Sequence, residues 1–295
     1  MAFTNIDSIL EAHPKTYVHA SNIKAKQRKT NLSSIQKTAL EKIEPEYVAY
    51  INAISTIQSY ERDAIARRVE LLNGYYDFIR NNGLDNVFTS QSKFRSTILE
   101  EFLVILFDGL LQQVRERIED RDQVLQCGNS KSYTNMYFYA QNVKEFISAP
   151  KIGVNMKDQD FAIYRELSLQ INDVEQKVVL PVVAIEAKTY LDKTMLEGSI
   201  ATAEKIKTGN PYSKFFIVTE TYEVDLKVDP AYSRIDQIYV LRKSNTRSVF
   251  SPIDVDVVKK LVDENADVSL VTYGRIFGNA CKAYKALKEQ GKSIR

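Results

Sequence analysis

The 295-residue sequence has few of the residues on which many hydrolytic and redox sites depend. Its two cysteines, Cys127 and Cys281, lie far apart and outside any CxxC spacing, so neither a disulfide framework nor a structural zinc site is indicated. Its two histidines, His13 and His19, both lie near the N-terminus. A Ser-His-Asp triad or a histidine-rich metal site would therefore have to be built from the end of the chain, and neither is favoured.

Motifs for nucleotides and membranes are absent as well. No GxxxxGK[ST] or GxGxxG sequence occurs, which disfavours ATPases and dehydrogenases, so we expect no nucleotide cofactor. No apolar run is long enough to span a bilayer, and the opening MAFTNIDSILEAHPKTY differs from a signal peptide, so we expect a cytoplasmic protein without a membrane partner. Charge is balanced, with 40 basic and 38 acidic residues, so a nucleic-acid site requires local clustering.

The spacing of apolar residues indicates a mainly helical N-terminal region over residues 1–90, where no convincing strand occurs. We expect Pro45 to break the first long helix there and Asn81-Asn82-Gly83 to close the last. A C-terminal helical extension is expected over 251–295, with a helix from Pro252 and another, carrying a stripe of lysines, near the end.

The middle of the chain, residues 91–250, predicts an α/β core with a mixed central β-sheet flanked by helices. A helix is expected from about Ser92 to Asp120, followed by a polar loop from Arg121 to Tyr133. We expect strands at 160–164, 178–188, 215–218 and 235–241, with 167–171 as the continuation or the hairpin partner of the first, and a crossover helix at 193–207. A crossover of this kind places active groups at strand ends.

One strand ends in charged residues. The run VVLPVVAIEAKTYL, from Val178 to Leu191, is apolar until Glu186 and Lys188, whose side chains should point to the same face of the strand. Asp160 stands directly before an earlier apolar segment, and Asp158 is the competing choice for this first acid. A structural salt bridge is the alternative explanation, but two charges at the end of a buried strand are costly without a purpose.

This arrangement suits phosphodiester hydrolysis. The reaction needs a hard divalent cation that keeps several waters, and Mg²⁺ is the physiological expectation. Asp160 and Glu186 can supply part of the metal shell, together with the backbone carbonyl of Ala187. Lys188 would orient the attacking water or stabilise the phosphate.

A further carboxylate is expected on the helix before the sheet. Glu100 lies nearer the apolar face than Glu101, because Leu103 and Phe107 follow it at three and seven residues. Glu100 is therefore the candidate site carboxylate, and the alternative is an acid that only favours a helix N-terminus.

A cluster of cations near the N-terminus could contact DNA. The sequence KAKQRK contains Lys24, Lys26, Arg28 and Lys29, and it would suit a flexible arm laid along phosphates. The alternative is a solvated run of charge without a ligand.

Several segments resemble the PD-(D/E)xK restriction endonucleases of the BbvCI type: ILEEF, KDQDF, VVAIEAKTYL with MLEGSIATAEKIK, NPYSKFFIVTE and IDQIYVLRK. The resemblance implies a Type II enzyme that cuts double-stranded DNA at a short sequence with magnesium, as a homodimer or as a heterodimer with a related subunit. Carried over, the metal acids fall on Asp160 and Glu186, the catalytic lysine on Lys188 and the helix carboxylate on Glu100. Ala187 stands where these enzymes often have a cysteine, and on a strand this side chain should point away from the site.

The sequence thus predicts a restriction-endonuclease-like nuclease core at 91–250 and a site-specific DNA endonuclease. Two alternatives remain open: a repair or recombination nuclease of the same superfamily that recognises DNA structure, and a non-catalytic DNA-binding subunit that retains the fold.

Overall fold

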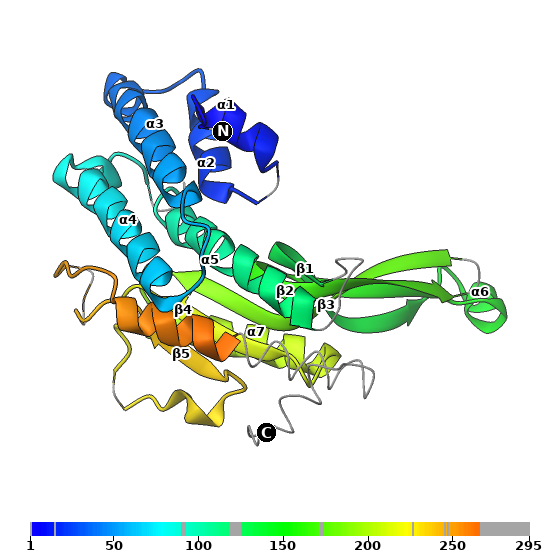
Figure 1. Ribbon diagram of the computed structural model, residues 1–295. Coiled ribbons are helices and arrows are strands. Elements are labelled where there is room, and N and C mark those ends of the chain that lie inside the picture. Colours follow the sequence, from blue (N-terminus) through cyan, green and yellow to red (C-terminus); the bar gives the residue numbers. More distant parts are fainter. Residues whose placement is uncertain are drawn as a thin grey trace.

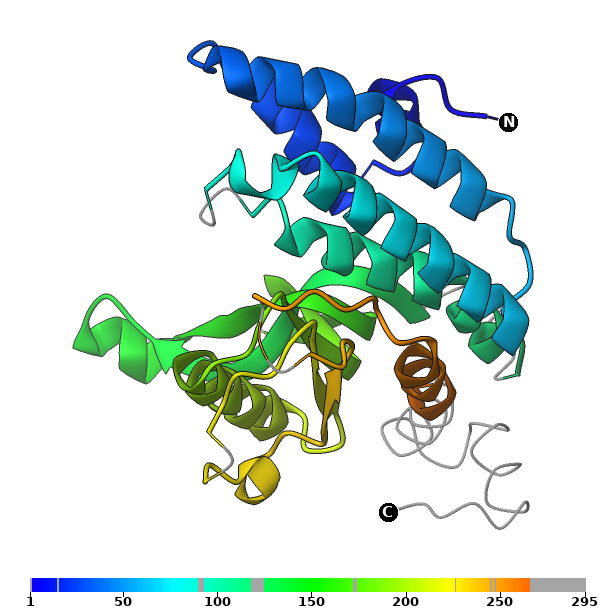
Figure 2. The same ribbon diagram turned by 90° about the vertical axis from the view of Figure 1, so that its left-hand side faces the viewer.

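The computed structural model describes residues 2–14, 16–89, 93–117, 125–171, 174–225, 227–244, 246 and 248–265. A five-stranded sheet lies between α5 on one face and α7 on the other, and the N-terminal helices stack on the outside of α5 (Figures 1 and 2). No helix in these residues is both long and apolar enough to cross a membrane.

The N-terminal region is helical, as the apolar spacing predicts. Ser33 and Gln36 form a capping box at the start of the longest helix of this region, and Gly83 ends the next with a left-handed backbone conformation, φ 65°. The elements are α1 (Ile6–Ala12), α2 (Val18–Gln27), α3 (Ser34–Ser55), α4 (Arg62–Asn81), the 3₁₀ turn η1 (Leu84–Asn86) and α5 (Ser96–Arg117).

The expected break at Pro45 is wrong, because α3 continues through it. Proline removes one backbone hydrogen bond, but Ile43 and Tyr47 on either side of it are completely buried in the helical core. Tertiary packing therefore holds the helix together where the local signal predicted an end.

The expected flexible arm at KAKQRK is also wrong, because most of this run is the last part of α2. Lys26 lies on the buried face of the helix with His19 and Ile23, and only 5% of it is exposed. Its ammonium donates to the Asn22 side chain at 2.6 Å and lies 5.4 Å from the centre of the Phe88 ring. The stem of a lysine can cover apolar surface in this way, so a local count of charges does not reveal a buried one.

The sheet has the order β1-β2-β3-β4-β5, with the first three strands antiparallel and the last two pairs parallel. This confirms the mixed sheet and its crossover helix. Asp192 caps that helix by accepting a hydrogen bond from the Met195 amide at 2.8 Å. The bounds are β1 (Leu125–Tyr139), α6 (Val143–Ser148), β2 (Lys151–Ile171), β3 (Val174–Lys188), α7 (Lys193–Gly209), β4 (Lys214–Thr219), η3 (Pro230–Tyr232) and β5 (Gln237–Val240).

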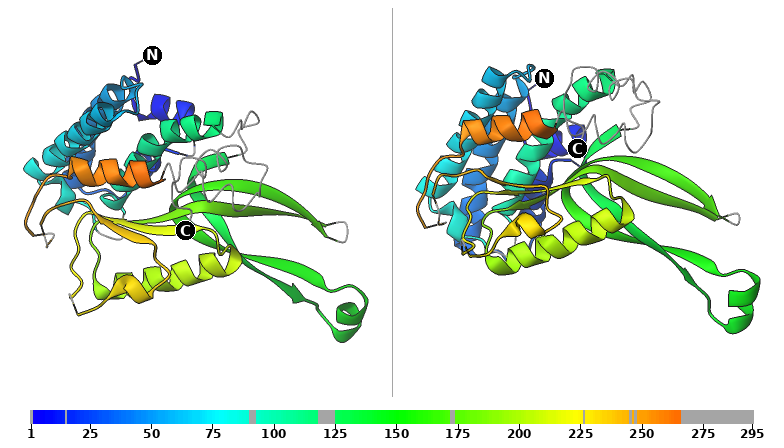
Figure 3. Two further views of the ribbon diagram at one scale, coloured as in Figure 1. Left: turned by 60° about the horizontal axis from the view of Figure 1, so that its bottom comes forward. Right: turned by 90° about the horizontal axis from the view of Figure 1, so that it is seen from below.

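The expected loop from Arg121 to Tyr133 is wrong over the described part, because β1 starts at Leu125. This strand lies at the edge of the sheet, and its first part, from Leu125 to Tyr133, carries mainly polar and small residues, so it lacks the apolar alternation of a covered strand. Beyond the body of the sheet, β1 and β2 continue together as a projecting hairpin with α6 at its tip (Figures 1 and 3).

The C-terminal extension is described only in part. A helix over residues 255–265 lies within the segment where one was expected from Pro252. The second expected helix and its stripe of lysines lie outside the described residues.

Candidate active site

The candidate site lies where β2 and β3 separate. The two strands pair from Ile171 and Val174 as far as Phe161 and Ile185, and one residue further the ladder ends. From there β2 continues with β1 into the hairpin. Beyond the last backbone pair, the Asp160 side chain replaces a backbone acceptor, since its Oδ2 accepts a hydrogen bond from the Ala187 amide at 3.0 Å. The separation exposes side chains that would otherwise lie within a continuous sheet.

Asp160, Glu186 and Lys188 come together at this point. The Lys188 ammonium lies 3.3 Å from Glu186 Oε2 and 3.6 Å from Asp160 Oδ2. The three side chains remain partly accessible, with 27% of Lys188, 29% of Asp160 and 11% of Glu186 exposed. A purely structural salt bridge would not need this opening, whereas a site for a metal or a phosphate does.

The charge state of Lys188 follows from its neighbours. Burial alone would lower the pKa of its ammonium, but the carboxylates of Asp160 and Glu186 outweigh burial and raise the pKa above its ordinary value. Lys188 is therefore a cation and a hydrogen-bond donor at neutral pH.

Glu100 belongs to the same cluster of charges. Burial raises its pKa to about 7, and the negative charge of Asp160 acts in the same direction. Lys93, the Ser96 hydroxyl and Lys188 oppose this rise, which places Glu100 within electrostatic reach of both strands of the site.

Glu101 points elsewhere. Its carboxylate accepts hydrogen bonds from the amides of His19 at 2.8 Å and Ala20 at 3.1 Å, and from the Tyr47 hydroxyl at 2.6 Å. It therefore links α5 to α2 and α3 within the helical core, where 2% of it is exposed. The competing first acid, Asp158, is exposed and has no ion pair with Lys188.

Two residues of the site have no signal in the motif itself. The Ser199 hydroxyl of α7 donates to Glu186 Oε2 at 2.5 Å, and 1% of Ser199 is exposed. The backbone amide of Glu220, directly after β4, donates to the carbonyl of Lys188 at 3.0 Å. A small polar residue among the inward positions of the α7 helix is the signal that could have identified Ser199.

Glu220 connects the site to the helical region. Its buried carboxylate accepts hydrogen bonds from the Tyr76 hydroxyl at 3.0 Å, from Arg242 at 2.9 Å and from Arg95 at 3.2 Å. Arg242 is itself 4% exposed. This network holds the ends of β3 and β4 against α4 and against the residue preceding α5, which fixes the backbone on which Lys188 stands.

The basic residues of the N-terminal run do not reach this site. Lys24 forms an ion pair with Asp7 at 2.6 Å on α1, and Lys26 is buried. Arg28 and Lys29 are exposed at the end of α2, with Lys29 just beyond the helix. Only these last two of the four candidates present their charges to solvent.

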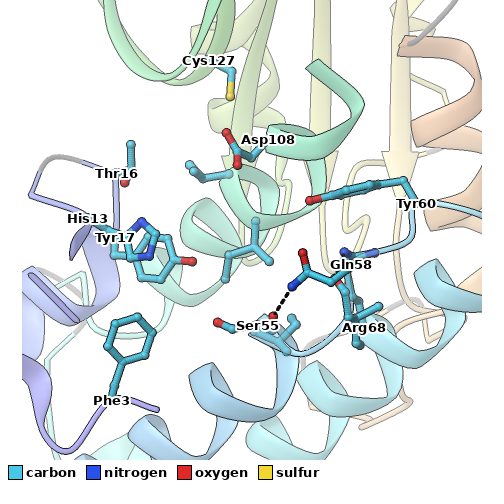
Figure 4. A pocket seen from close by; sticks show the side chains of 14 residues that line it. Phe3, His13, Thr16, Tyr17, Ser55, Gln58, Tyr60, Arg68, Asp108 and Cys127 are labelled. Carbon is cyan, nitrogen blue, oxygen red and sulfur yellow. Dashed lines mark hydrogen bonds between the residues drawn. The ribbon is translucent and has the colours of Figure 1, made fainter. Parts of the chain in front are cut away.

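A cavity of about 490 Å³ lies apart from the site, between the N-terminal helices, α5 and the start of β1 (Figure 4). Asp108 and Cys127 lie on its wall, whereas none of Asp160, Glu186 and Lys188 does. The guanidinium of Arg68 stacks 4.3 Å from the centre of the Tyr60 ring at its edge. The ring of Tyr60 in turn packs directly on the backbone of Gly109. The volume of this cavity therefore does not identify the catalytic centre.

Comparison with known proteins agrees with this core. The model of the Bpu10I restriction endonuclease family matches residues 91–251, which is more than half of the 295 residues. A chain in a solved structure described as the native BbvCI A2B2 tetramer has the same fold, with a TM-score of 0.67 and 20% sequence identity over 89% of this chain and 98% of that one. No curated protein matches the sequence. The chain belongs to the Bpu10I restriction endonuclease family.

Proposed function

We propose that the chain is a Type II restriction endonuclease, or a subunit of one, that hydrolyses phosphodiester bonds of double-stranded DNA at a short specific sequence with Mg²⁺. The observation that carries the proposal is the convergence of Asp160, Glu186 and Lys188 at the point where β2 leaves β3. These residues lie within 91–251, the part of the chain that matches the family model. We assign the nuclease core to 91–250, between a helical region at 1–90 and an extension at 251–295.

The donor atoms suit Mg²⁺. Asp160 Oδ1 and Glu186 Oε1 accept no hydrogen bond from any described residue, so one oxygen of each carboxylate remains available. Within the described ranges, no group of three or more histidine, cysteine, aspartate or glutamate residues could hold a metal. Two carboxylates and the Ala187 carbonyl are an incomplete shell of hard oxygen ligands, which is what Mg²⁺ prefers because it keeps several waters. When bound, the ion would acidify a water and neutralise phosphate charge.

Each side chain has a separate role in this proposal. Asp160 and Glu186 hold the ion and keep Lys188 in place. Lys188 donates hydrogen bonds to the attacking water or to a phosphate oxygen, since its ammonium is charged and held by both carboxylates. Glu100, with a pKa near neutrality, holds or releases a proton beside them.

The exposure of the basic residues suggests which of them contact DNA, and the proposed cleavage of both strands bears on the assembly. Of the basic run, Arg28 and Lys29 are the exposed residues, so we propose them as phosphate contacts and expect little from Lys24 and Lys26. Two active sites allow both strands of a duplex to be cut in one binding event, which supports a homodimer or a heterodimer with a related subunit.

Replacement of Lys188 by methionine tests the proposal, because methionine keeps most of the length of the side chain but removes the charge. Cleavage of a long plasmid with Mg²⁺ should fall by at least roughly 100-fold, the typical cost of losing one donor that stabilises transition-state charge. The matched control is Lys193→Met, because Lys193 is a lysine five positions further along with 68% of its side chain exposed, and it should cut as the wild type does.

The products distinguish the alternatives. Discrete fragments whose ends share one sequence support a restriction endonuclease, whereas preferential cutting of branched DNA supports a repair nuclease. DNA binding without cleavage, with Mg²⁺ and any partner chain present, supports a non-catalytic subunit. Undiminished cutting by purified Lys188→Met would contradict the assignment of the site.

A further inference from the structure

Exposed apolar side chains are concentrated in one part of the molecule. Eight of the twelve large hydrophobic side chains that are exposed in the described chain belong to the hairpin formed by the end of β1, α6 and the start of β2. We call residues 135–157 the arm. The other four are scattered singly, as is normal for a soluble surface. The exposed residues of the arm are Met136, Tyr137, Phe138, Tyr139, Val143, Phe146, Ile147 and Met156.

At its base the arm lies beside the end of α7, and beyond that it projects away from the body of the protein with no other described element covering it (Figures 1 and 3). Its apolar side chains include 62% exposed Phe138 on the strand and 78% exposed Ile147 on α6. Such a concentration of exposed apolar side chains is unusual on a protein that functions alone, and it commonly marks a site of association.

The arm has a definite internal structure. The Asn155 side chain donates to Asn135 at 2.7 Å across the two strands at its base. The ring of Tyr137 lies directly over Gly153, where a Cβ atom would come within 2.3 Å of the ring. At the tip, Lys151 forms an ion pair with Glu145 at 3.2 Å. The apolar side chains are thus carried by a hairpin that its own hydrogen bonds, ring packing and ion pair hold together.

The outer side of β1 is an unprotected sheet edge. Natural proteins guard such edges with charges, prolines or bulges, because exposed amides and carbonyls pair with another strand. The segment from Tyr133 to Gln141, YTNMYFYAQ, contains neither a charged residue nor a proline, and beyond the bulge at Tyr133 the pairing with β2 is regular. This edge is open to an additional strand.

The charge of the arm determines which kind of partner fits. The arm has four charged residues, Lys144, Glu145, Lys151 and Lys157, and Glu145 forms an ion pair with Lys151. The edge of β1 within the arm, residues 135–139, carries no charge, so it offers no cations to the phosphates of nucleic acid. An uncharged edge does not repel a second copy of itself, and an antiparallel pair of identical edge strands satisfies twofold symmetry.

We propose that the arm is the surface through which two copies of this chain associate, with the β1 edges paired antiparallel and the α6 helices packed beside them. The inference rests on the proposed function only in that a pair of active sites lets a nuclease cut both strands in one binding event.

Sedimentation of the full-length protein without DNA and without Mg²⁺ tests this surface. The wild type should associate in a concentration-dependent manner. The double variant Phe138→Glu with Phe146→Glu should weaken association at least roughly tenfold, since it places charge in the centre of the interface. The matched control carries the same two changes at Ile35 and Tyr232, which are 70% and 94% exposed outside the arm, and it should associate as the wild type does.

Crosslinking locates the contact. In a background with Cys127 and Cys281 replaced by serine, Phe138→Cys should form a covalent dimer with a short bismaleimide, and Tyr232→Cys should not. A monomeric wild type, equal association of the arm variant, or equal crosslinking at both positions would overturn the proposal. A chain that assembles through the arm but does not cut DNA would contradict the proposed function instead, so the two failures are distinguishable.

Discussion

The hydrogen bond from Ser199 to Glu186 allows a sharp test of how the site is held together. Both residues are buried, and the hydroxyl donates to Oε2, the same oxygen that lies 3.3 Å from the Lys188 ammonium. Oε1 is thereby left without a hydrogen bond from any described residue. Replacement of Ser199 by alanine removes one fixed partner and allows the carboxylate to rotate away from the orientation that suits the metal.

The magnitude follows from the chemistry of this contact. A hydrogen bond to a charged group contributes about 1.5–3 kcal/mol, and loss of a partner that orients a metal ligand commonly costs about 10–100-fold in metal affinity or activity. We therefore expect Ser199→Ala to raise the Mg²⁺ concentration for half-maximal cleavage by about 10–100-fold. Ser199→Thr, which keeps the hydroxyl, should restore most of the affinity.

The assay compares Mg²⁺ titrations of plasmid cleavage with calorimetric titrations of the free protein with Mg²⁺, which do not depend on turnover. Thr202→Ala is the matched control, because Thr202 is buried on the same helix but its hydroxyl donates to the Gly198 carbonyl of that helix at 3.0 Å. Equal metal dependence of wild type and Ser199→Ala would refute the reasoning, as would an equal shift in the Thr202→Ala control.

Three further predictions concern stability and DNA binding. Burial raises the pKa of Glu101 from 4.5 to about 7, so the folded state binds more protons than the unfolded state between these pH values. The free energy of unfolding should therefore fall by roughly 3 kcal/mol as pH rises across that interval. Urea titrations at several pH values should show a flatter profile for Glu101→Gln. Gly109→Ala should lower the free energy of unfolding by about 1–3 kcal/mol, because the added Cβ atom would overlap the ring of Tyr60. Gly74→Ala should raise it by about 0.5–1 kcal/mol, because the added Cβ atom meets no atom within 4 Å. Equal changes of the two variants in urea titrations would contradict the packing argument. Replacement of Arg28 and Lys29 by alanine should weaken DNA binding and reduce the salt dependence of log Kd by about 2, measured by fluorescence anisotropy at several salt concentrations, and an unchanged slope would exclude these phosphate contacts.

The sequence by itself determined the parts of the protein that depend on local pattern. The apolar run before Glu186 and Lys188 is rich in β-branched residues and typical of a covered strand, and side chains two apart on a strand share a face. The helix from Lys193 follows from the spacing of its apolar residues and its aspartate cap. A strand, crossover helix and strand then require the parallel pairing of β3 with β4.

The sequence favoured Glu100 over Glu101 and Asp160 over Asp158, but only the tertiary structure decided which charges are buried and what holds each of them. Glu100 and Glu101 are neighbours in the sequence, yet one lies near Asp160 and the other is bound by the helical core, because α5 is packed on both sides. Nothing in the sequence distinguishes Lys26 from the other cations of its run, and its burial follows from the packing of α2 against the rings of Phe88 and Phe94.

The strand β1 and the arm could not be predicted from the local sequence pattern. An edge strand that leaves the body buries neither face completely, so it does not have the alternating pattern by which strands are recognised. Its existence depends on the long-range pairing with β2, and that pairing separates β2 from β3 at Asp160. The local pattern thus supplied the carboxylates and the lysine, and the long-range strand pairing supplied the opening in which they meet.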